Sequence, residues 1–172
     1  LDFLFLKRLE NYKQNKTIGD KDIIDNETTI FKGKGILKGK PKKYFPFLEG
    51  LNFIESKQIG LYSCYIEHSN TLKKEDTFLE SGRKVELFLG EQILLGQRTK
   101  QESILNISYS KTNYVFKNSL YAISSRKDIT VLKQLYGLLI SKFSTYFQFL
   151  TSSNWGVSTR PEILLEEYLA TP

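Results

Sequence analysis

Five residues near the start of the chain match a pattern that binds a methyl-donor cofactor. The segment Phe31–Gly35 reads Phe-Lys-Gly-Lys-Gly, an F-x-G-x-G pattern whose glycines let the backbone approach S-adenosylmethionine. A cofactor loop of this kind follows a buried apolar strand and opens a helix. Here Thr28–Ile30 is short, Ile36–Gly39 has no helical pattern, and the chain contains no Pro-Pro, hence no Asn-Pro-Pro-Tyr type of motif. We therefore expect no cofactor site in this segment.

A second set of residues loosely matches the D…E-x-K metal site of restriction nucleases: Asp25, Glu55 and Lys57. Two carboxylates and a lysine can hold Mg²⁺ and activate water, but such triplets are frequent by chance. The chain has one histidine, His68, and one cysteine, Cys64. Neither a zinc site nor a Ser–His–Asp arrangement is indicated. We expect neither a metal site nor catalytic residues.

Six lysines lie in a stretch that has no Asp or Glu between Thr28 and Leu48. Lysines neutralise phosphates, and glycines let the backbone come near them. The simpler alternative is a solvated surface loop. Because glycines and aromatic residues interleave with the charge, we predict that the stretch faces DNA. The predicted contacts are Lys32, Lys34, Lys38, Lys40, Lys42, Lys43 and the following Tyr44.

A second polar turn, Gly96–Gln101, follows an apolar strand-like run. Arg98 offers a bidentate fork to guanine, and Gln97 can pair with adenine. The alternative is a turn with ordinary surface residues. We predict DNA contacts from Gln97, Arg98 and Lys100.

The pattern of apolar residues predicts the elements that position these side chains. Short apolar runs broken by polar turns suggest an antiparallel sheet, preceded by a strand-like segment at Thr29–Leu37. An amphipathic helix is expected from Asp128, its N-cap, to Leu150, and a short helix from Arg160. The sheet-forming runs are Glu91–Arg98, Ser103–Tyr109, Asn113–Lys117 and Leu120–Ser124, with a further strand expected at Gln58–Glu67.

Length and net charge limit the classes of protein to which the chain can belong. The 172 residues suit one domain, and the net charge of +6 with a pI near 9.2 favours an anionic partner. One cysteine allows no disulfide framework, which suits the cytoplasm. No apolar run approaches ~20 residues, so no membrane partner is expected. The chain contains no Met at all, so we expect a fragment, with residues 1–28 as a connector helix and linker and 29–172 as the domain itself.

Several blocks, taken in order, resemble one family of DNA-binding modules. Leu135–Phe143 is similar to a helix reading Leu-Leu-x-x-Leu-Asn-Ser-Lys-Leu, with Ile140 in place of the Asn and Phe143 in place of the last Leu. The other blocks are Ile30–Ile36, Tyr44–Gly50, Phe88–Arg98, Tyr114–Tyr121, Arg160–Ile163 and Leu169–Pro172. Together they resemble the TaqI-like C-terminal specificity domain of adenine-N6 DNA methyltransferases, including fused type II restriction-modification enzymes.

The resemblance implies an α+β fold: a β-rich DNA-recognition subdomain with a long amphipathic helix and a short C-terminal helix packed on the sheet. It implies sequence-specific recognition of duplex DNA by a module that is not catalytic by itself. S-adenosylmethionine and methyl transfer are then expected in an N-terminal methyltransferase domain of the same chain, which flips the adenine. Three alternatives stay open: a type I specificity subunit, a nuclease fragment using Asp25, Glu55 and Lys57, and a structural domain that binds protein through aromatic residues.

Overall fold

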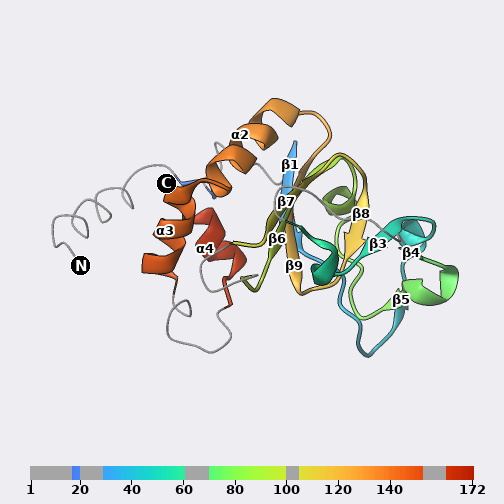
Figure 1. The fold of residues 1–172 in the computed structure, drawn as a ribbon. Coiled ribbons are helices and arrows are strands. Elements are labelled where there is room, and N and C mark those ends of the chain that lie inside the picture. The colour runs from blue at the N-terminus through green and yellow to red at the C-terminus, as the bar shows by residue number, and fades with distance from the viewer. Residues whose placement is uncertain (1–16, 20–28, 61–69, 100–104, 153–161) are drawn as a thin grey trace.

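The computed structural model describes residues 17–19, 29–60, 70–99, 105–152 and 162–172. Its fold is α+β, as the sequence predicts: a four-stranded sheet has helices on one face and a smaller β-rich lobe on the other (Figure 1). Most of residues 1–28, where a connector helix and linker are expected, and most of the strand expected at 58–67 fall outside the described residues. Among the described helices, none has the length and apolarity that a membrane crossing requires.

The four-stranded sheet is antiparallel throughout and has the order β1-β9-β6-β7. Both of its faces are covered, so the two central strands β6 and β9 are buried along nearly their whole length and do not alternate buried with exposed residues. Three of the four predicted strand runs form it together with the first strand. The bounds are β1 Ile30–Lys34, β6 Glu91–Gly96, β7 Ile107–Ser110 and β9 Leu120–Ser125.

Helices cover one face of this sheet, and the predicted long helix is in fact two helices. Helix α2 spans Ile129–Leu139 and α3 spans Lys142–Thr151. The break lies at Ser141, whose Oγ accepts a hydrogen bond from the backbone N–H of Ser144 at 3.1 Å and so caps α3. A serine at this point offers the backbone an N-cap in place of a continued helix. Apolar periodicity continues across the break, so periodicity alone could not reveal it.

The helix-side core contains residues from the segment that we expected to be a linker. Ile18 is buried in it, and its backbone N–H donates to the carbonyl of Thr171 at 2.9 Å. The short terminal helix α4 spans Leu165–Leu169, starting later than predicted, and Tyr168 Oη donates to the carbonyl of Gly96 at 2.9 Å. Part of the segment expected to be a linker thus packs against the C-terminal segment.

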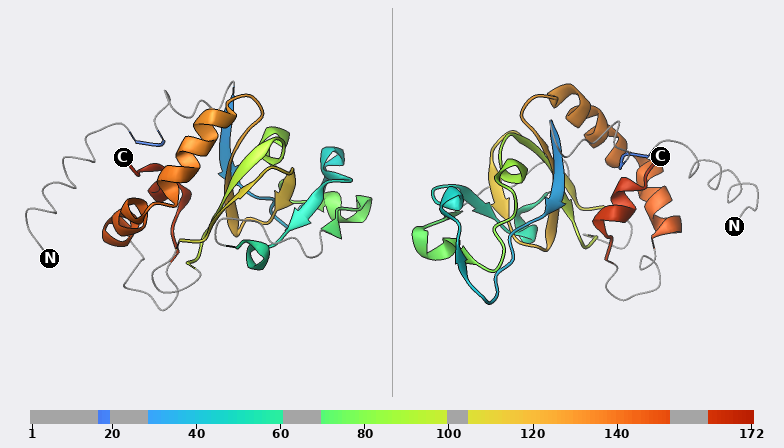
Figure 2. Two further views of the ribbon diagram at one scale, coloured as in Figure 1. Left: turned by 45° about the horizontal axis from the view of Figure 1, so that its top comes forward. Right: turned by 180° about the vertical axis from the view of Figure 1, so that it is seen from behind.

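The β-rich lobe covers the other face, as the views in Figure 2 also show. We define it as the described residues 35–60 and 70–90 together with β8. It contains a three-stranded sheet with the order β4-β3-β8, a two-stranded sheet β2-β5 and several short 3-10 turns. The strand bounds are β2 Lys43–Tyr44, β3 Asn52–Ile54, β4 Asn70–Thr71, β5 Phe78–Leu79 and β8 Tyr114–Phe116.

Strand β8 departs from the expected antiparallel arrangement. It pairs with β3 in parallel, with Phe53 opposite Val115, although it lies between β7 and β9 in the sequence. All three of its residues are buried, and Phe116 packs edge-on against Phe88 with ring centroids 5.3 Å apart. Local alternation could not predict this partner, because β3 is distant in the sequence and the pairing depends on the core of the lobe.

Candidate nucleic-acid interface

The six predicted lysines separate into two groups. In β1, Lys32 and Lys34 lie opposite Ile123 and Tyr121 of β9, residues that belong to the helix-side core. Lys32 Nζ donates to the carbonyl of Gly19 at 3.3 Å, and Lys34 Nζ lies 5.5 Å from the centre of the Tyr121 ring. Both ammonium groups thus contact the protein itself, and a cation over an aromatic face is a stabilising contact.

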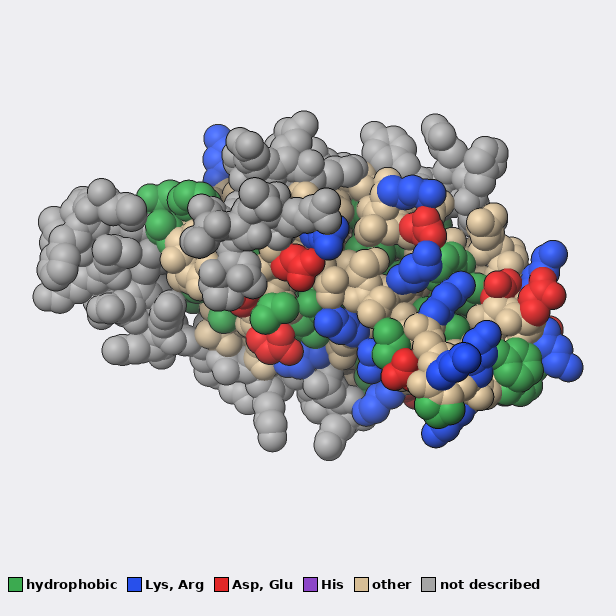
Figure 3. Space-filling view, turned by 90° about the horizontal axis from the view of Figure 1, so that it is seen from below, with side chains coloured by type: hydrophobic (Ala, Val, Ile, Leu, Met, Phe, Trp, Pro, Cys, Tyr) green, Lys and Arg blue, Asp and Glu red, His purple; other side chains and the backbone are tan. Residues whose placement is uncertain are grey.

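The remaining four lysines follow β1 and lie on the β-rich lobe. We call Lys38, Lys40, Lys42 and Lys43 the lysine loop; all four are exposed. None of the four makes an ion pair with an acid among the described residues. Lys and Arg side chains gather over the lobe on the face drawn in Figure 3. This is the arrangement that phosphate contact needs, because uncompensated ammonium groups are open to an anion.

An exposed aromatic pair stands at the end of the lysine loop. Tyr44 of β2 lies opposite Phe78 of β5, and their rings stack with centroids 5.1 Å apart and planes 26° from parallel. Each side chain is 42% exposed. Tyr44 Oη donates to Glu49 Oε2 at 3.2 Å, and Lys74 Nζ lies 5.9 Å from the centre of the Tyr44 ring. Partial desolvation and the Glu49 carboxylate raise the pKa of Tyr44, so its phenol stays a donor.

The two strands that carry this pair are supported from behind. The backbone N–H of Phe45 donates to the carbonyl of Thr77 at 3.0 Å, which extends the β2-β5 pairing. The Phe45 ring packs edge-on against Phe47 and lies directly against Gly82, where any side chain would overlap it. Tyr44 and Phe78 therefore project from a supported element rather than from a free loop.

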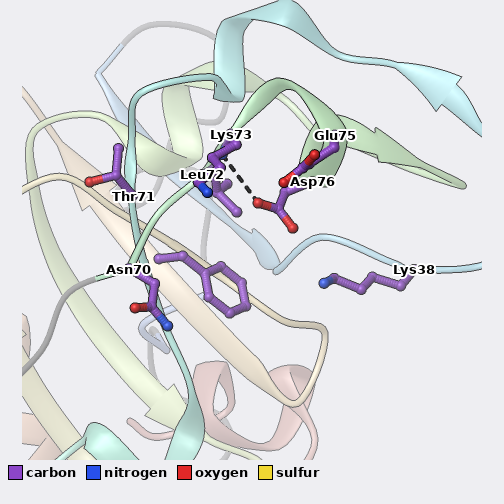
Figure 4. Close-up of a pocket in the computed structure, with 8 residues that line it drawn as sticks. Lys38, Asn70, Thr71, Leu72, Lys73, Glu75 and Asp76 are labelled. Carbon is purple, nitrogen blue, oxygen red and sulfur yellow. Dashed lines mark hydrogen bonds between the residues drawn. The ribbon is translucent and has the colours of Figure 1, made fainter.

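A hollow of about 510 Å³ lies on the same lobe (Figure 4). Lys38 and Phe53 border it, with the Lys38 Nζ 5.8 Å from the centre of the Phe53 ring. The opposite wall carries Asp76, whose Oδ2 accepts the backbone N–H of Lys73 at 3.2 Å. Because both lysines and carboxylates line the hollow, it suits an anion less well than the lysine loop does. The remaining lining residues are Asn70, Thr71, Leu72 and Glu75.

The glycines of the F-x-G-x-G segment have a packing role. The backbone N–H of Gly35 donates to the carbonyl of Leu120 at 3.1 Å, and a Cβ on Gly35 would overlap the carbonyl oxygen of Phe116. A Cβ on Gly33 would come within 3.3 Å of Leu87. Close approach between β1 and its neighbours accounts for both residues, without a ligand. Gly35 is buried, so our expectation that it lets the backbone approach a phosphate is wrong.

Gln97 and Arg98 lie at the far end of β6, next to the C-terminal segment. Gln97 Nε2 donates to Tyr121 Oη at 3.1 Å, and the Gln97 carbonyl accepts the N–H of Ile163 at 2.8 Å. Arg98 donates from Nη2 to Glu162 Oε1 at 3.1 Å, with 60% of its side chain exposed. The structure thus places Gln97 beside Tyr121, over which Lys34 also lies, and Arg98 beside Glu162. Lys100 lies outside the described residues.

Two of the three residues of the nuclease alternative come together, and Asp25 lies outside the described residues. Glu55 Oε1 accepts from Lys117 Nζ at 2.7 Å, and Glu55 Oε2 pairs with Lys57 Nζ at 3.1 Å. The hydrogen bond from Lys117, followed by that from Lys57, lowers the pKa of Glu55. In the part of the chain that the structure describes, no group of three His, Cys, Asp or Glu side chains could hold a metal ion.

Phe78 was absent from the predicted contacts, and so were Lys73 and Lys74. The stretch containing them reads as polar, and the sequence shows no alternation around Phe78. Their place beside Tyr44 comes from the pairing of β2 with β5. The one available signal was the Lys73–Lys74 doublet, which taken alone is typical of any solvated turn.

The chain was also compared with known proteins. No protein-family model matches the sequence, and no curated protein matches it at a significant level.

Proposed function

We propose that the β-rich lobe binds duplex DNA and that the lysine loop contacts the phosphate backbone. The observation that carries this proposal is the set of four exposed lysines without ion pairs among the described residues, which ends at an exposed aromatic pair. A lysine that neutralises a phosphate releases a counterion, so such a loop supplies affinity for any sequence. Phosphate contacts set orientation, and base contacts elsewhere supply specificity.

The proposal extends to the parent protein through the family resemblance. The chain would serve as the target-recognition module of a restriction-modification adenine-N6 methyltransferase in the cytoplasm. Methyl transfer and S-adenosylmethionine would belong to an N-terminal domain of the same protein. The module itself would present the duplex, and the catalytic domain would flip the adenine.

In this proposal Arg98 reads a base, because its guanidinium group can donate two hydrogen bonds to the edge of a guanine. In the free chain, Nε and Nη2 of Arg98 donate to the same oxygen of Glu162, at 3.3 and 3.1 Å. Exposed ion pairs of this kind contribute about 0–1 kcal/mol. Exchanging Glu162 for a guanine edge therefore requires little energy, while the Glu162 carboxylate opposes the approach of DNA to this side.

The test measures DNA affinity at several salt concentrations. We expect the triple variant K38A/K40A/K43A to weaken binding to all duplexes about equally. The slope of log affinity against log salt should flatten by roughly 0.9 for each lost phosphate contact. The matched control is R126A/K127A/K133A, which removes the same charge from exposed positions before and within α2.

The control variant separates contact from general charge. Equal flattening in both triple variants would mean that DNA responds only to net charge, and an unchanged slope in K38A/K40A/K43A would place the lysine loop away from DNA. Either result overturns the proposed interface. Flattening in the lysine-loop variant alone supports it.

A further inference from the structure

We infer that Phe78, backed by Tyr44, is a stacking site for a nucleobase that has left the base stack of the bound duplex. The inference rests on the proposed DNA-binding function and adds a site to it. It starts from the exposure of two large rings on the same small sheet, where 42% of each side chain faces solvent. Exposed apolar rings that lie side by side form a small patch, and such patches can mark binding sites.

The pair is held in a fixed orientation, as a stacking site requires. Direct pairing of Tyr44 with Phe78 and the hydrogen bond from Tyr44 to Glu49 restrain both rings. Little conformational entropy is therefore lost when a third ring is added. Within the described residues, Lys74 is the cation near the Tyr44 ring, and none lies over Phe78. Phe78 thus presents the apolar ring surface of the pair.

The charge around the pair selects the occupant. Lys74 Nζ lies 5.9 Å from the centre of the Tyr44 ring, so a ligand on the pair meets an ammonium group nearby. A nucleotide has the matching shape: a flat base with a π face, joined to a phosphate. Proteins that bind unpaired nucleotides combine a positively charged surface with aromatic side chains in this way.

An intact duplex leaves no base face free for Phe78, because stacking within the duplex covers both faces of every internal base. Occupancy therefore requires one base to leave the stack, at a cost of a few kcal/mol that is smallest for an unpaired base. The site consequently favours DNA with an unpaired or extruded base over fully paired DNA. This distinguishes it from the lysine loop, whose phosphate contacts are available on either duplex.

The experiment compares two probes that differ by one nucleotide: a fully paired duplex and the same duplex carrying one unpaired 2-aminopurine. We expect the chain to bind the second more tightly by about tenfold, since stacking of a base on an aromatic side chain contributes about 1–3 kcal/mol. The 2-aminopurine fluorescence should rise on binding, because the base leaves the neighbouring bases whose stacking quenches it.

Two substitutions at Phe78 test whether its aromatic ring is required. F78L keeps an apolar side chain in β5 but has no π face, so the preference and the fluorescence rise should both be lost. F78W keeps a π face and should retain both. Unfolding midpoints of the variants show whether the fold is kept, and F149A provides a control at another exposed ring, 47% exposed on α3.

The outcomes separate this inference from the proposed function. Binding of both probes with equal affinity, or an F78L variant that keeps the preference and the fluorescence rise, overturns the stacking site while DNA binding stands. Failure to bind either probe overturns the proposed function and the stacking site with it. Loss of preference in F78L but not in F78W or F149A supports the stacking site.

Discussion

The two layers that cover the four-stranded sheet differ in how they treat their lysines. On the helix side, Lys32 donates to a backbone carbonyl and Lys34 lies over the ring of buried Tyr121. On the β-rich lobe, the lysine loop is exposed and makes no ion pair with the described acids. The run of lysines is therefore divided between the two layers, with Lys32 half-buried and the other five lysines exposed. The difference teaches that a charge run should be divided at its strands before a binding role is assigned to it.

The largest expected effect tests whether the two layers depend on the shared sheet. Phe116 in the lobe core and Leu132 in the helix-side core are both fully buried. We expect F116A to destabilise the protein by about 3–5 kcal/mol and L132A by about 2–5 kcal/mol, because each leaves a cavity. Urea unfolding should show a single transition for both variants. Two separate transitions in either variant would show that the layers fold independently; K133A, on the exposed face of α2, serves as the control.

The next largest effect is the change in stability when either of two glycines is replaced, and its sign is expected to differ between the two layers. A methyl group on Gly35 would overlap the carbonyl oxygen of Phe116, whereas nothing lies within 4 Å of a Cβ on Gly137 in α2. We expect G35A to destabilise the protein by about 1–3 kcal/mol through overpacking. G137A should stabilise it by about 0.5–1 kcal/mol, because alanine is the better helix former. Thermal or urea unfolding measures both, and a neutral G35A would contradict the packing role of this glycine.

A smaller effect on stability is expected from the ion pair at the end of β6. Loss of the exposed Arg98–Glu162 pair should lower stability by no more than about 1 kcal/mol in either R98A or E162Q. DNA affinity should separate the two: R98A weakens binding to the cognate site by about 1–3 kcal/mol if Arg98 reads a base edge, whereas E162Q strengthens binding. Equal affinity losses for R98A on cognate and random DNA would make Arg98 a phosphate contact.

The smallest effect concerns pH and the Glu55 carboxylate. Its pKa is lowered, first by the hydrogen bond from Lys117 and then by that from Lys57. A lowered pKa in the folded state means that the pair stabilises the fold above the usual carboxyl range and that this contribution is lost as pH falls through the folded pKa. We expect K117M to move the pKa of Glu55 toward its ordinary value, measured by NMR titration. K57M should move it less, and a larger shift in K57M would reverse the assigned order of the two lysines.

Much of the secondary structure could be predicted from local pattern. The strand runs around Glu91–Gly96 and Leu120–Ser125 and the helical character of the segment after Asp128 are all present. Local rules were insufficient where a capping serine competes with continued periodicity, as at Ser141. They were also insufficient for β8, whose parallel partner is far away in the sequence.

The candidate site was predicted only in part, and for a physical reason. Four of the six lysines and Tyr44 are exposed on one lobe, whereas Lys32 and Lys34 contact the helix side because alternate residues of β1 face that layer. Phe78 could not be predicted, since it joins Tyr44 only through the pairing of two short strands. Gln97 lies within the interface between β6 and the C-terminal segment, where its amide bonds to Tyr121.

Composition and periodicity by themselves determined the strand-like runs and the amphipathic helical segment, the basic character and the run of lysines without intervening acids, because these depend on residue types and short spacings. Tertiary structure alone decided which lysines face solvent, which glycines serve packing and which ring stands beside Tyr44. Those properties depend on contacts between segments distant in the sequence, whose pairing is selected by the free energy of the whole core rather than by any local preference.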